Sequence, residues 1–343
     1  MEKISPLFPI LDNPRIGPLA HTAAEAPLDS TGCLTEYRPL VSRSLISKVN
    51  SKRGVPFTHA INPYRGCEFG CRYCYARYTH EFLELGTAEF ERKIYFKQSA
   101  AWLLEQELKR LKPGTQIALG TATDPYQPLE RKLKLTRSLL EVFARYGGFR
   151  IGIVTKSALV ARDADVLKNI ARVSQLTVCI TVTTTDRKLA RILEPRAPRP
   201  DLRIRALGEL RQAGIRAGVM CSPLMPGITD SRSSIDSVAK AASAVGACFL
   251  FAGALFLKPC SLPTFFEFVR EHFPQQLPAY ERRYKASAFV STEYRTRMRD
   301  LVESIRAKYR LGSRYLPNSE YQDAFASDMP FGETQPWLPF AQS

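Results

Sequence analysis

The amino-acid sequence contains no apolar run of about 18 residues, a length at which a stretch becomes a candidate for spanning a bilayer as a helix. Its first residues, MEKISPLFPILDNPRIGPLA, also lack the basic segment and the apolar stretch of a secretory signal peptide. We therefore expect a cytoplasmic protein without a membrane segment. In that reducing compartment, cysteines serve in metal binding or catalysis more often than in disulfides.

Acidic residues are scarce relative to basic ones. The 343 residues include 33 Asp and Glu against 49 Lys and Arg, which gives a formal net charge of +16 at pH 7. Such an excess favours polyanionic partners, nucleic acid above all. The alternative is a basic surface that is simply solvated.

Short apolar runs alternate with amphipathic segments from about Pro56 onward. Strands are predicted at residues 59–62, 116–120, 150–155, 176–181, 217–221 and 248–252. Helices are predicted between them at residues 98–111, 136–146, 161–173, 201–213 and 232–244. This alternation indicates βα units around a parallel sheet. Six units predict an α/β fold with a partial (β/α)6 barrel, whose chemistry is expected at the carboxyl ends of the strands.

Both ends of the chain differ from this central part. Residues 1–55 are rich in Pro, Gly and Ser without sustained periodicity, so we expect an irregular N-terminal arm. After about Pro259, helical patterns follow at residues 263–273, 278–289 and 292–310. The predicted organisation is an arm (1–55), a barrel (56–260), a helical C-terminal extension (261–316) and a tail (317–343).

Three cysteines gather in the segment 62–76, which reads NPYRGCEFGCRYCYA. Cys67, Cys71 and Cys74 have the spacing C-x3-C-x2-C. Three thiolates can hold three irons of a [4Fe–4S] cubane and leave the fourth iron without a protein ligand, whereas most electron-transfer cubanes have four cysteine ligands. Gly66 and Gly70 suit a tight loop whose backbone approaches an inorganic cluster closely.

A zinc site is the alternative for the same loop, with His80 as the fourth ligand. Structural zinc sites usually have four ligands arranged as paired C-x2-C knuckles. The sequence near His80 contains no second knuckle. The pattern therefore favours an iron–sulfur cluster over zinc.

Four further segments, beyond the cysteine loop, carry distinctive residue patterns. They are residues 121–128 (TATDPYQP), 155–157 (TKS), 181–186 (TVTTTD) and 190–196 (ARILEPR). Together with the cysteine loop, they make residues 58–259 resemble the radical SAM superfamily, and within it the branch related to spore photoproduct lyase. The resemblance implies a [4Fe–4S] cluster whose open iron is chelated by S-adenosylmethionine (SAM), and cleavage of SAM to a 5′-deoxyadenosyl radical. An electron donor such as a flavodoxin or ferredoxin is then expected.

The resemblance also places SAM contacts at the strand ends. Thr123, beside Asp124, matches a hydroxyl residue that holds SAM. Lys156 matches a lysine that contacts the SAM carboxylate, for which an ammonium is a suitable charge. Thr181 ends the fourth barrel strand, within reach of the methionyl amine or the ribose. The ordinary alternatives are a helix cap for each threonine and a solvated loop charge for Lys156.

Glu194, Arg196 and Tyr73 complete the expected cofactor-binding set. Glu194 is expected to bind the SAM amine or ribose, and Arg196 the SAM carboxylate or the substrate. Tyr73 is the aromatic residue directly before the last cysteine of the loop. The alternative for Glu194 and Arg196 is a surface ion pair.

The loop after the second barrel strand is stiffened by two prolines. We expect Tyr126 and Gln127 at the mouth of the barrel. There Tyr126 either stacks on a base or adenine, a contact typically worth about 1–3 kcal/mol, or simply packs.

One position departs from the lyase pattern. The lyases have a cysteine just upstream of the hydroxyl–Asp pair that quenches the product radical, and this sequence has Thr121 there. Repair of the spore lesion is therefore doubtful for this chain. Cys221 and Cys260, near strand ends, are alternative hydrogen donors or else core residues, whereas Cys179 and Cys248 are expected to pack as small hydrophobic side chains.

Three functional classes follow. The first is a radical SAM enzyme acting on DNA, RNA or a nucleotide-like substrate. The second is a radical SAM enzyme that modifies a protein, peptide or small metabolite, with its basic surface serving an acidic reductant. The third is a non-catalytic iron–sulfur module, which Lys156 and Thr123 argue against because a pure binder needs no SAM contacts.

Overall fold

The computed structural model describes residues 16–32, 34–49 and 57–314. The strands are β1 Ser30–Thr31, β2 Glu36–Pro39, β3 Ile46–Lys48, β4 His59–Ile61, β5 Tyr64–Arg65, β6 Lys93–Phe96, β7 Gln116–Leu119, β8 Arg150–Thr155, β9 Gln175–Thr181, β10 Ala217–Leu224 and β11 Leu250–Ala254. The α-helices are α1 Ile16–Ala24, α2 Tyr78–Glu81, α3 Ala100–Leu108, α4 Glu130–Leu133, α5 Leu135–Arg145, α6 Ala164–Val173, α7 Arg187–Leu193, α8 Pro200–Gln212, α9 Arg232–Ala244, α10 Leu262–His272, α11 Leu277–Tyr284 and α12 Thr292–Lys308. Short 3₁₀ helices are η2 Tyr75–Arg77, η3 Thr87–Glu91, η4 Ala158–Asp163, η5 Pro259–Ser261 and η6 Pro274–Gln276.

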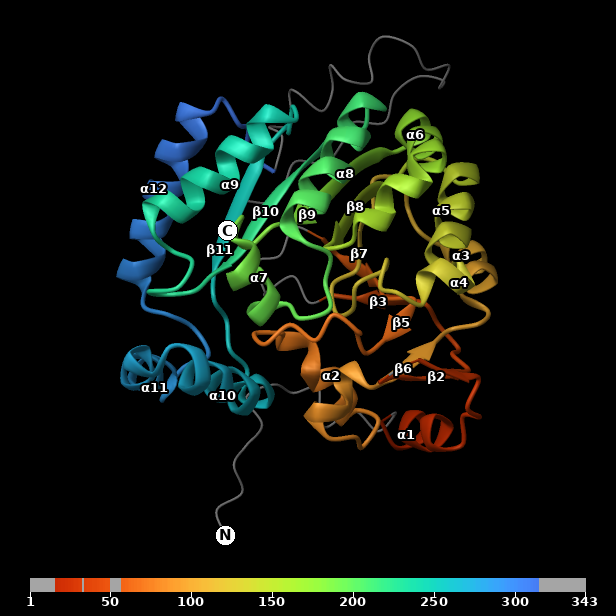
Figure 1. Cartoon of the computed structure of the whole chain (residues 1–343). Coiled ribbons are helices and arrows are strands. Elements are labelled where there is room, and N and C mark those ends of the chain that lie inside the picture. Colours follow the sequence, from red (N-terminus) through yellow and green to blue (C-terminus); the bar gives the residue numbers. More distant parts are fainter. Residues whose placement is uncertain (1–15, 33, 50–56, 315–343) are drawn as a thin grey trace.

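A seven-stranded sheet forms the centre of the fold, in the order β11-β10-β9-β8-β7-β4-β3. Its first six strands in this order pair in parallel, and β3 pairs antiparallel with β4. Helices α6, α8 and α9 pack against β9 and β10, and α5 lies beside α6 and α3 (Figure 1). The prediction of an α/β fold with six βα units is confirmed.

The residue pattern explains these elements. In β8 every second residue is buried, so that Ile151, Ile153 and Thr155 face inward. Strands β9 and β10 are buried over most of their length, as strands of a parallel sheet covered by helices are. On α5, Leu139, Leu140 and Phe143 form the buried face, with the spacing of an amphipathic helix.

The N-terminal arm is less irregular than predicted. Its described part contains α1 and three short strands, and β3 extends the central sheet. β2 pairs in parallel with β6 in a second, four-stranded sheet ordered β1-β2-β6-β5. The sequence pattern missed these strands because each has at most four residues, and the partners of β2 lie far along the chain at Lys93–Phe96. Residues 1–15, 33 and 50–56 of the arm lie outside the described residues.

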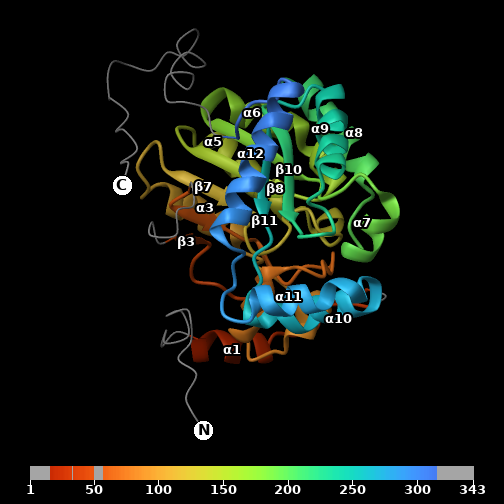
Figure 2. The same ribbon diagram turned by 90° about the vertical axis from the view of Figure 1, so that its left-hand side faces the viewer.

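The C-terminal extension is helical as expected, but α11 ends at Tyr284 rather than near residue 289. The following residues run beside the end of β11, where Phe289 forms an antiparallel bridge with Phe256. Figure 2 shows α12 along β11, with α10 and α11 at the same end of the molecule as α1. The expected tail, 317–343, lies outside the described ranges, and the four-part division of the chain stays a prediction.

The finding on membrane helices is limited to the same described residues. Among them, no helix combines the length and the apolar composition needed to cross a bilayer.

Candidate functional site

The cysteine loop follows β5 and is buried. Cys67 and Cys71 are 8% and 7% exposed, and Cys74 is partly exposed. Gly66 has a φ of 79°, and a Cβ there would lie 2.7 Å from the carbonyl oxygen of Phe90. Only glycine adopts that backbone region without strain and tolerates such an approach. The expectation of a tight glycine-dependent loop is therefore confirmed at Gly66.

The loop rests on the segment that follows α7. The amide of Arg72 donates to the carbonyl of Leu193 at 2.9 Å, and the amide of Arg196 donates to Phe69 at 3.3 Å. Gly70, with a φ of 62°, faces the guanidinium of Arg196, which would lie 3.0 Å from an added Cβ. Residues 193–196 (LEPR) therefore contact the backbone of the cysteine loop.

Glu194 is the centre of a buried polar cluster beneath the loop. Its carboxylate pairs with Arg203 at 2.5 Å and accepts hydrogen bonds from Tyr73 and, at 2.8 Å, from Thr183. Burial alone would raise the pKa of Glu194, but Arg203, Lys156 and these hydrogen bonds outweigh it and lower the pKa. Glu194 is therefore ionised and buried, so the alternative of a surface ion pair with Arg196 is wrong for it.

The residues after β7 hold the loop from the other side. Thr123 Oγ1 donates to the carbonyl of Gly66 at 2.6 Å and accepts from Gln127 Nε2 at 3.2 Å. Gln127 also accepts from the amide of Glu68 at 3.1 Å. Because Gln127 is 0% exposed and Tyr126 1%, neither side chain lies at a solvent-filled mouth. Packing is the correct reading for Tyr126, and base stacking on it is not.

Asp124 joins the ends of two neighbouring strands. One carboxylate oxygen accepts from Thr155 Oγ1 at 2.6 Å and from the amide of Tyr126 at 2.9 Å, and the other accepts from the amide of Lys156 at 2.7 Å. Burial raises the pKa of Asp124 in spite of these donors. The TATDPYQP element thus fixes the geometry between the cysteine loop and Lys156.

Lys156 lies near the cysteine loop, where its charge lowers the pKa of Cys71 and Cys74. Its Nζ lies 5.5 Å from the ring centre of Tyr73. Burial favours the neutral amine, but the charges of Cys71 and Glu194 outweigh it and raise the pKa of Lys156. The ammonium therefore stays protonated and partly exposed beside the loop.

Glu68, inside the cysteine loop, connects it to the N-terminal arm. Its carboxylate accepts from Tyr37 Oη at 2.8 Å and from the amide of Leu129 at 3.1 Å. Tyr37 belongs to β2, so an arm strand contacts a residue adjacent to Cys67. The sequence analysis did not identify either residue.

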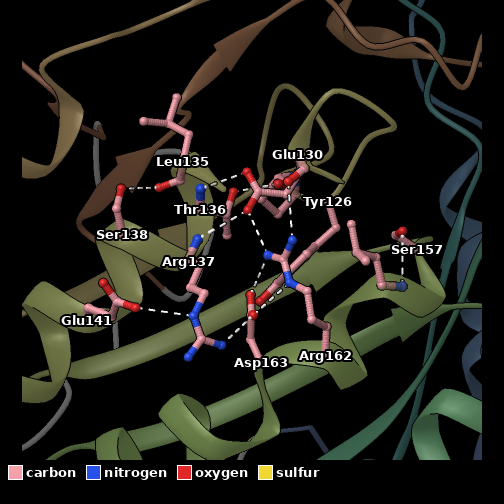
Figure 3. A network of polar contacts seen from close by, with 12 residues as sticks. Tyr126, Glu130, Leu135, Thr136, Arg137, Ser138, Glu141, Ser157, Arg162 and Asp163 are labelled. Atoms are coloured by element: carbon pink, nitrogen blue, oxygen red, sulfur yellow. Dashed lines mark hydrogen bonds and ion pairs between the residues drawn. The ribbon is translucent and has the colours of Figure 1, made fainter. Parts of the chain in front are cut away.

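A further ionic network surrounds the fully buried Glu130 (Figure 3). Glu130 accepts from Tyr64 Oη at 2.5 Å, from the amide of Thr136 at 2.8 Å and from Arg162 at 2.9 Å. Arg162 also binds Asp163 through two nitrogens at 2.8 Å. Tyr64 precedes the cysteine loop and Arg162 follows Lys156, so this network clamps the two segments together.

The thiols themselves are in an environment that disfavours thiolates without a bound cation. Burial raises the pKa of Cys71 to about 12, an effect that Lys156 opposes, and burial also raises the pKa of Cys67 and Cys74. Iron ions bound to such thiols supply the missing positive charge. Three thiols on one tight loop, with a cation beside them, fit an iron–sulfur cluster.

The zinc alternative has no support in the geometry of the described ranges. His80 is 0% exposed and its Nε2 lies 2.9 Å from the carbonyl oxygen of Lys93. Within residues 16–32, 34–49 and 57–314, no group of three or more His, Cys, Asp or Glu side chains, the loop cysteines included, is arranged to hold a metal ion, so this finding does not distinguish zinc from an iron–sulfur cluster. The seven described cysteines form no disulfide.

The other singled-out residues lie as follows. Thr121 accepts from Asn62 Nδ2 at 3.2 Å and, through its carbonyl, from Tyr75. Cys221 is 1% exposed with its sulfur 3.9 Å from the carbonyl of Thr183, which supports the core reading. Cys260 is partly exposed, with its sulfur 3.9 Å from the carbonyl of Tyr75, beside the cysteine loop.

Comparison with known proteins identifies the family. The family model described as Radical SAM superfamily matches residues 61–236. The chain belongs to the radical SAM superfamily. An uncharacterized protein of Mycobacterium tuberculosis is 30% identical over 283 residues, which are 82% of this chain and 83% of the relative. An uncharacterized protein of Methanocaldococcus jannaschii is 30% identical over 195 residues, 55% of this chain and 71% of the relative.

The fold has relatives of the same superfamily among solved structures. A spore photoproduct lyase mutant with bound AdoMet and dinucleoside spore photoproduct superposes with a TM-score of 0.60 and 15% identity, over 81% of this chain and 82% of the lyase. This likeness confirms the predicted resemblance at the level of the fold. The chain is a radical SAM enzyme, which sets aside the alternative of a non-catalytic module.

Superfamily membership implies a [4Fe–4S] cluster and SAM, and the residues present fit both. The SAM contacts expected of Thr123, Asp124, Thr181, Glu194 and Tyr73 stay predictions. In the structure Thr181 is 2% exposed at the end of β9, and the polar atoms of the other four are engaged by protein partners. Sequence reasoning missed Arg203, which lies inside the helix predicted at residues 201–213 and pairs with Glu194.

Proposed function

We propose that Cys67, Cys71 and Cys74 ligate a [4Fe–4S] cluster with one open iron, and that the chain cleaves SAM reductively. The observation that carries this proposal is the placement of two buried thiols, Cys67 and Cys71, and the partly exposed Cys74 on one glycine-dependent loop beside the ammonium of Lys156. When bound, the cluster and SAM supply a 5′-deoxyadenosyl radical that abstracts hydrogen from a substrate. The electron that this chemistry needs comes from a small donor such as a flavodoxin or ferredoxin.

The residues around the loop then divide into two groups. Lys156 and Arg196 are the partly exposed cations beside the thiols, and we assign them to the carboxylate of SAM and to SAM or substrate respectively. Thr123 and Glu194 hold the loop through their hydrogen bonds with Gly66 and Tyr73, and Asp124 holds the amide of Lys156. These three side chains already have protein hydrogen-bond partners. They can therefore contact SAM directly only through lone pairs or hydrogens that those partners do not use.

The proposed substrate class is nucleic acid. Support comes from the net charge of +16 and from the fold likeness to a lyase that binds a dinucleoside photoproduct. Thr121 stands where a quenching cysteine is expected, so we do not propose spore photoproduct repair. Modification of a protein or a small metabolite is the second candidate, with the basic surface binding an acidic flavodoxin.

Anaerobic reconstitution tests the cluster assignment. The wild-type chain should bind about four irons and four sulfides with the absorption of a cubane cluster, and substitution of Cys67 or Cys74 by alanine should lower the iron content sharply. Retention of one zinc ion and no iron under the same conditions would contradict it. For the substrate class, single-stranded oligonucleotide binding should weaken steeply with salt.

A further inference from the structure

Three aromatic side chains form a surface group at the rim of the cysteine loop. Phe256 and Phe289 stack with their ring centres 4.7 Å apart and an interplanar angle of 26°, and Tyr75 lies 6.1 Å from Phe256. Phe289 is 54% exposed and Tyr75 40%. Within the described ranges, Trp102 is the other aromatic residue among the exposed large hydrophobic side chains.

The hydrophobic core does not account for this group. None of the three residues belongs to the buried clusters of the described chain or to the partly buried hydrophobic residues packed against them. Contiguous exposed apolar surface on a folded protein commonly marks a binding site. The exposed parts of Phe289 and Tyr75 are therefore available to a ligand.

The backbone holds these rings in place. Phe256 and Phe289 lie opposite each other in an antiparallel bridge, and the amide of Leu257 donates to the carbonyl of Ala288 at 3.0 Å. Tyr75 Oη donates to the carbonyl of Thr121. Because each ring sits on a hydrogen-bonded segment, little ordering is needed when a flat ligand stacks on it.

The position of the group connects it to the proposed chemistry. Tyr75 directly follows Cys74, and Ser261 Oγ donates to the carbonyl of Cys74 at 2.8 Å, which ties η5 to the loop. Phe256 lies in the short segment between β11 and η5. A ligand stacked on these rings is therefore next to the loop that we assign to the cluster.

The charge around Phe289 indicates what kind of ligand it is. Residues 281–300 contain six basic side chains, among them Arg282, Arg283, Lys285 and Arg295, and three acidic ones, and all nine are exposed, so the segment carries a net positive charge. An aromatic peptide side chain would use the rings but not this positive charge. A nucleotide of a nucleic-acid strand uses both, because its base stacks on the rings and its phosphate is anionic.

We propose that Tyr75, Phe256 and Phe289 form a stacking platform for an unpaired base of the nucleic-acid substrate. This inference rests on the proposed function and names the subsite that receives the substrate. The outer face of Phe289 bears the base, and the flanking arginines and lysine contact the phosphates.

The test compares two labelled strands of about 12 nucleotides, a length within the site sizes of single-strand binders. One is single-stranded DNA, and the other is an abasic deoxyribose-phosphate strand with the same charge. Fluorescence anisotropy with the full chain should show wild type preferring the base-bearing strand by about 5- to 100-fold. Phe289→Ala and Phe256→Ala should lose this preference, Phe289→Tyr should keep it, and Trp102→Ala, on α3, should leave it unchanged.

The outcomes separate this inference from the proposed function. Equal wild-type affinity for both strands, or an equal loss in Trp102→Ala, overturns the platform but leaves nucleic acid as the substrate class. Failure of wild type to bind either strand overturns the nucleic-acid proposal, and the platform with it. Formation of 5′-deoxyadenosine without substrate should be unchanged in Phe289→Ala, and its loss would assign the rings to SAM instead.

Discussion

Glu194 and Arg203 form an ion pair of 2.5 Å in which both side chains are 1% exposed, directly beneath the tyrosine that precedes the third loop cysteine. Glu194→Gln leaves the guanidinium of Arg203 buried without a counter-charge. Breaking a buried pair in this way costs about 3–5 kcal/mol of unfolding free energy. Urea unfolding should show this loss, together with a lower iron content after reconstitution.

The double variant Glu194→Gln/Arg203→Gln provides the control. It removes both charges, so it should lose less stability than the sum of the two single variants. Additive losses would mean that the two side chains do not act as a pair.

Tyr37→Phe removes the hydrogen bond by which the arm contacts Glu68 in the cysteine loop. We expect the free energy of unfolding to fall by about 1 kcal/mol. The electron paramagnetic resonance spectrum of the reduced cluster should also change, because the loop loses a hydrogen bond that holds it in position. Tyr309→Phe is the matched control, since Tyr309 donates at 2.7 Å to Asp236 outside the loop. An identical spectrum for wild type and Tyr37→Phe would remove the arm from cluster positioning.

Lys156→Met should raise the dissociation constant for SAM by about 10- to 100-fold, the worth of a hydrogen bond to a charged group. The iron content should stay at the wild-type level, because the ammonium ligates no iron. Lys188→Met, on the exposed N-terminal turn of α7, should bind SAM like wild type. Unchanged SAM affinity in Lys156→Met, measured by isothermal titration, would refute this assignment.

Acid should destabilise the protein through His80. Burial, with Arg65 and Arg77 adding to it, lowers the pKa of this residue to about 4 from 6.5. Between these values the unfolded chain binds a proton that the native state does not, so the unfolding free energy falls as the pH falls. From pH 7 to pH 5 this amounts to about 2 kcal/mol.

His80→Gln isolates that contribution, because it keeps a donor for the carbonyl of Lys93 but does not titrate. Urea unfolding at pH 7 and pH 5 should show a smaller pH-dependent loss in this variant than in wild type. Equal losses in both proteins would show that His80 does not drive the acid sensitivity.

The sequence predicted the parts of the fold that depend on local periodicity. The barrel strands and their helices were found to within a few residues, because buried strands and amphipathic helices have distinct spacings. The strands of the arm were not found, since β2 is defined by its pairing with distant β6. The end of α11 was misplaced because the bridge between Phe256 and Phe289 overrides helical propensity after Tyr284.

The candidate site was predicted as a set of segments rather than as a set of contacts. The cysteine loop and the strand-end motifs were identified by their spacing, and the structure brings them together. The partners of those motifs were not identifiable: Gln127 was placed at the mouth although it is fully buried, and Arg203 had no local signal. Such pairings depend on tertiary packing, which one sequence does not reveal.

The most direct test of the account is the formation of 5′-deoxyadenosine by the anaerobically reconstituted chain given SAM and dithionite. We expect wild type and Cys248→Ala, a cysteine outside the loop, to produce it. Cys71→Ala should produce none, because a loop with two thiols does not hold the cluster with its open iron. Normal formation of 5′-deoxyadenosine by Cys71→Ala would contradict the central claim.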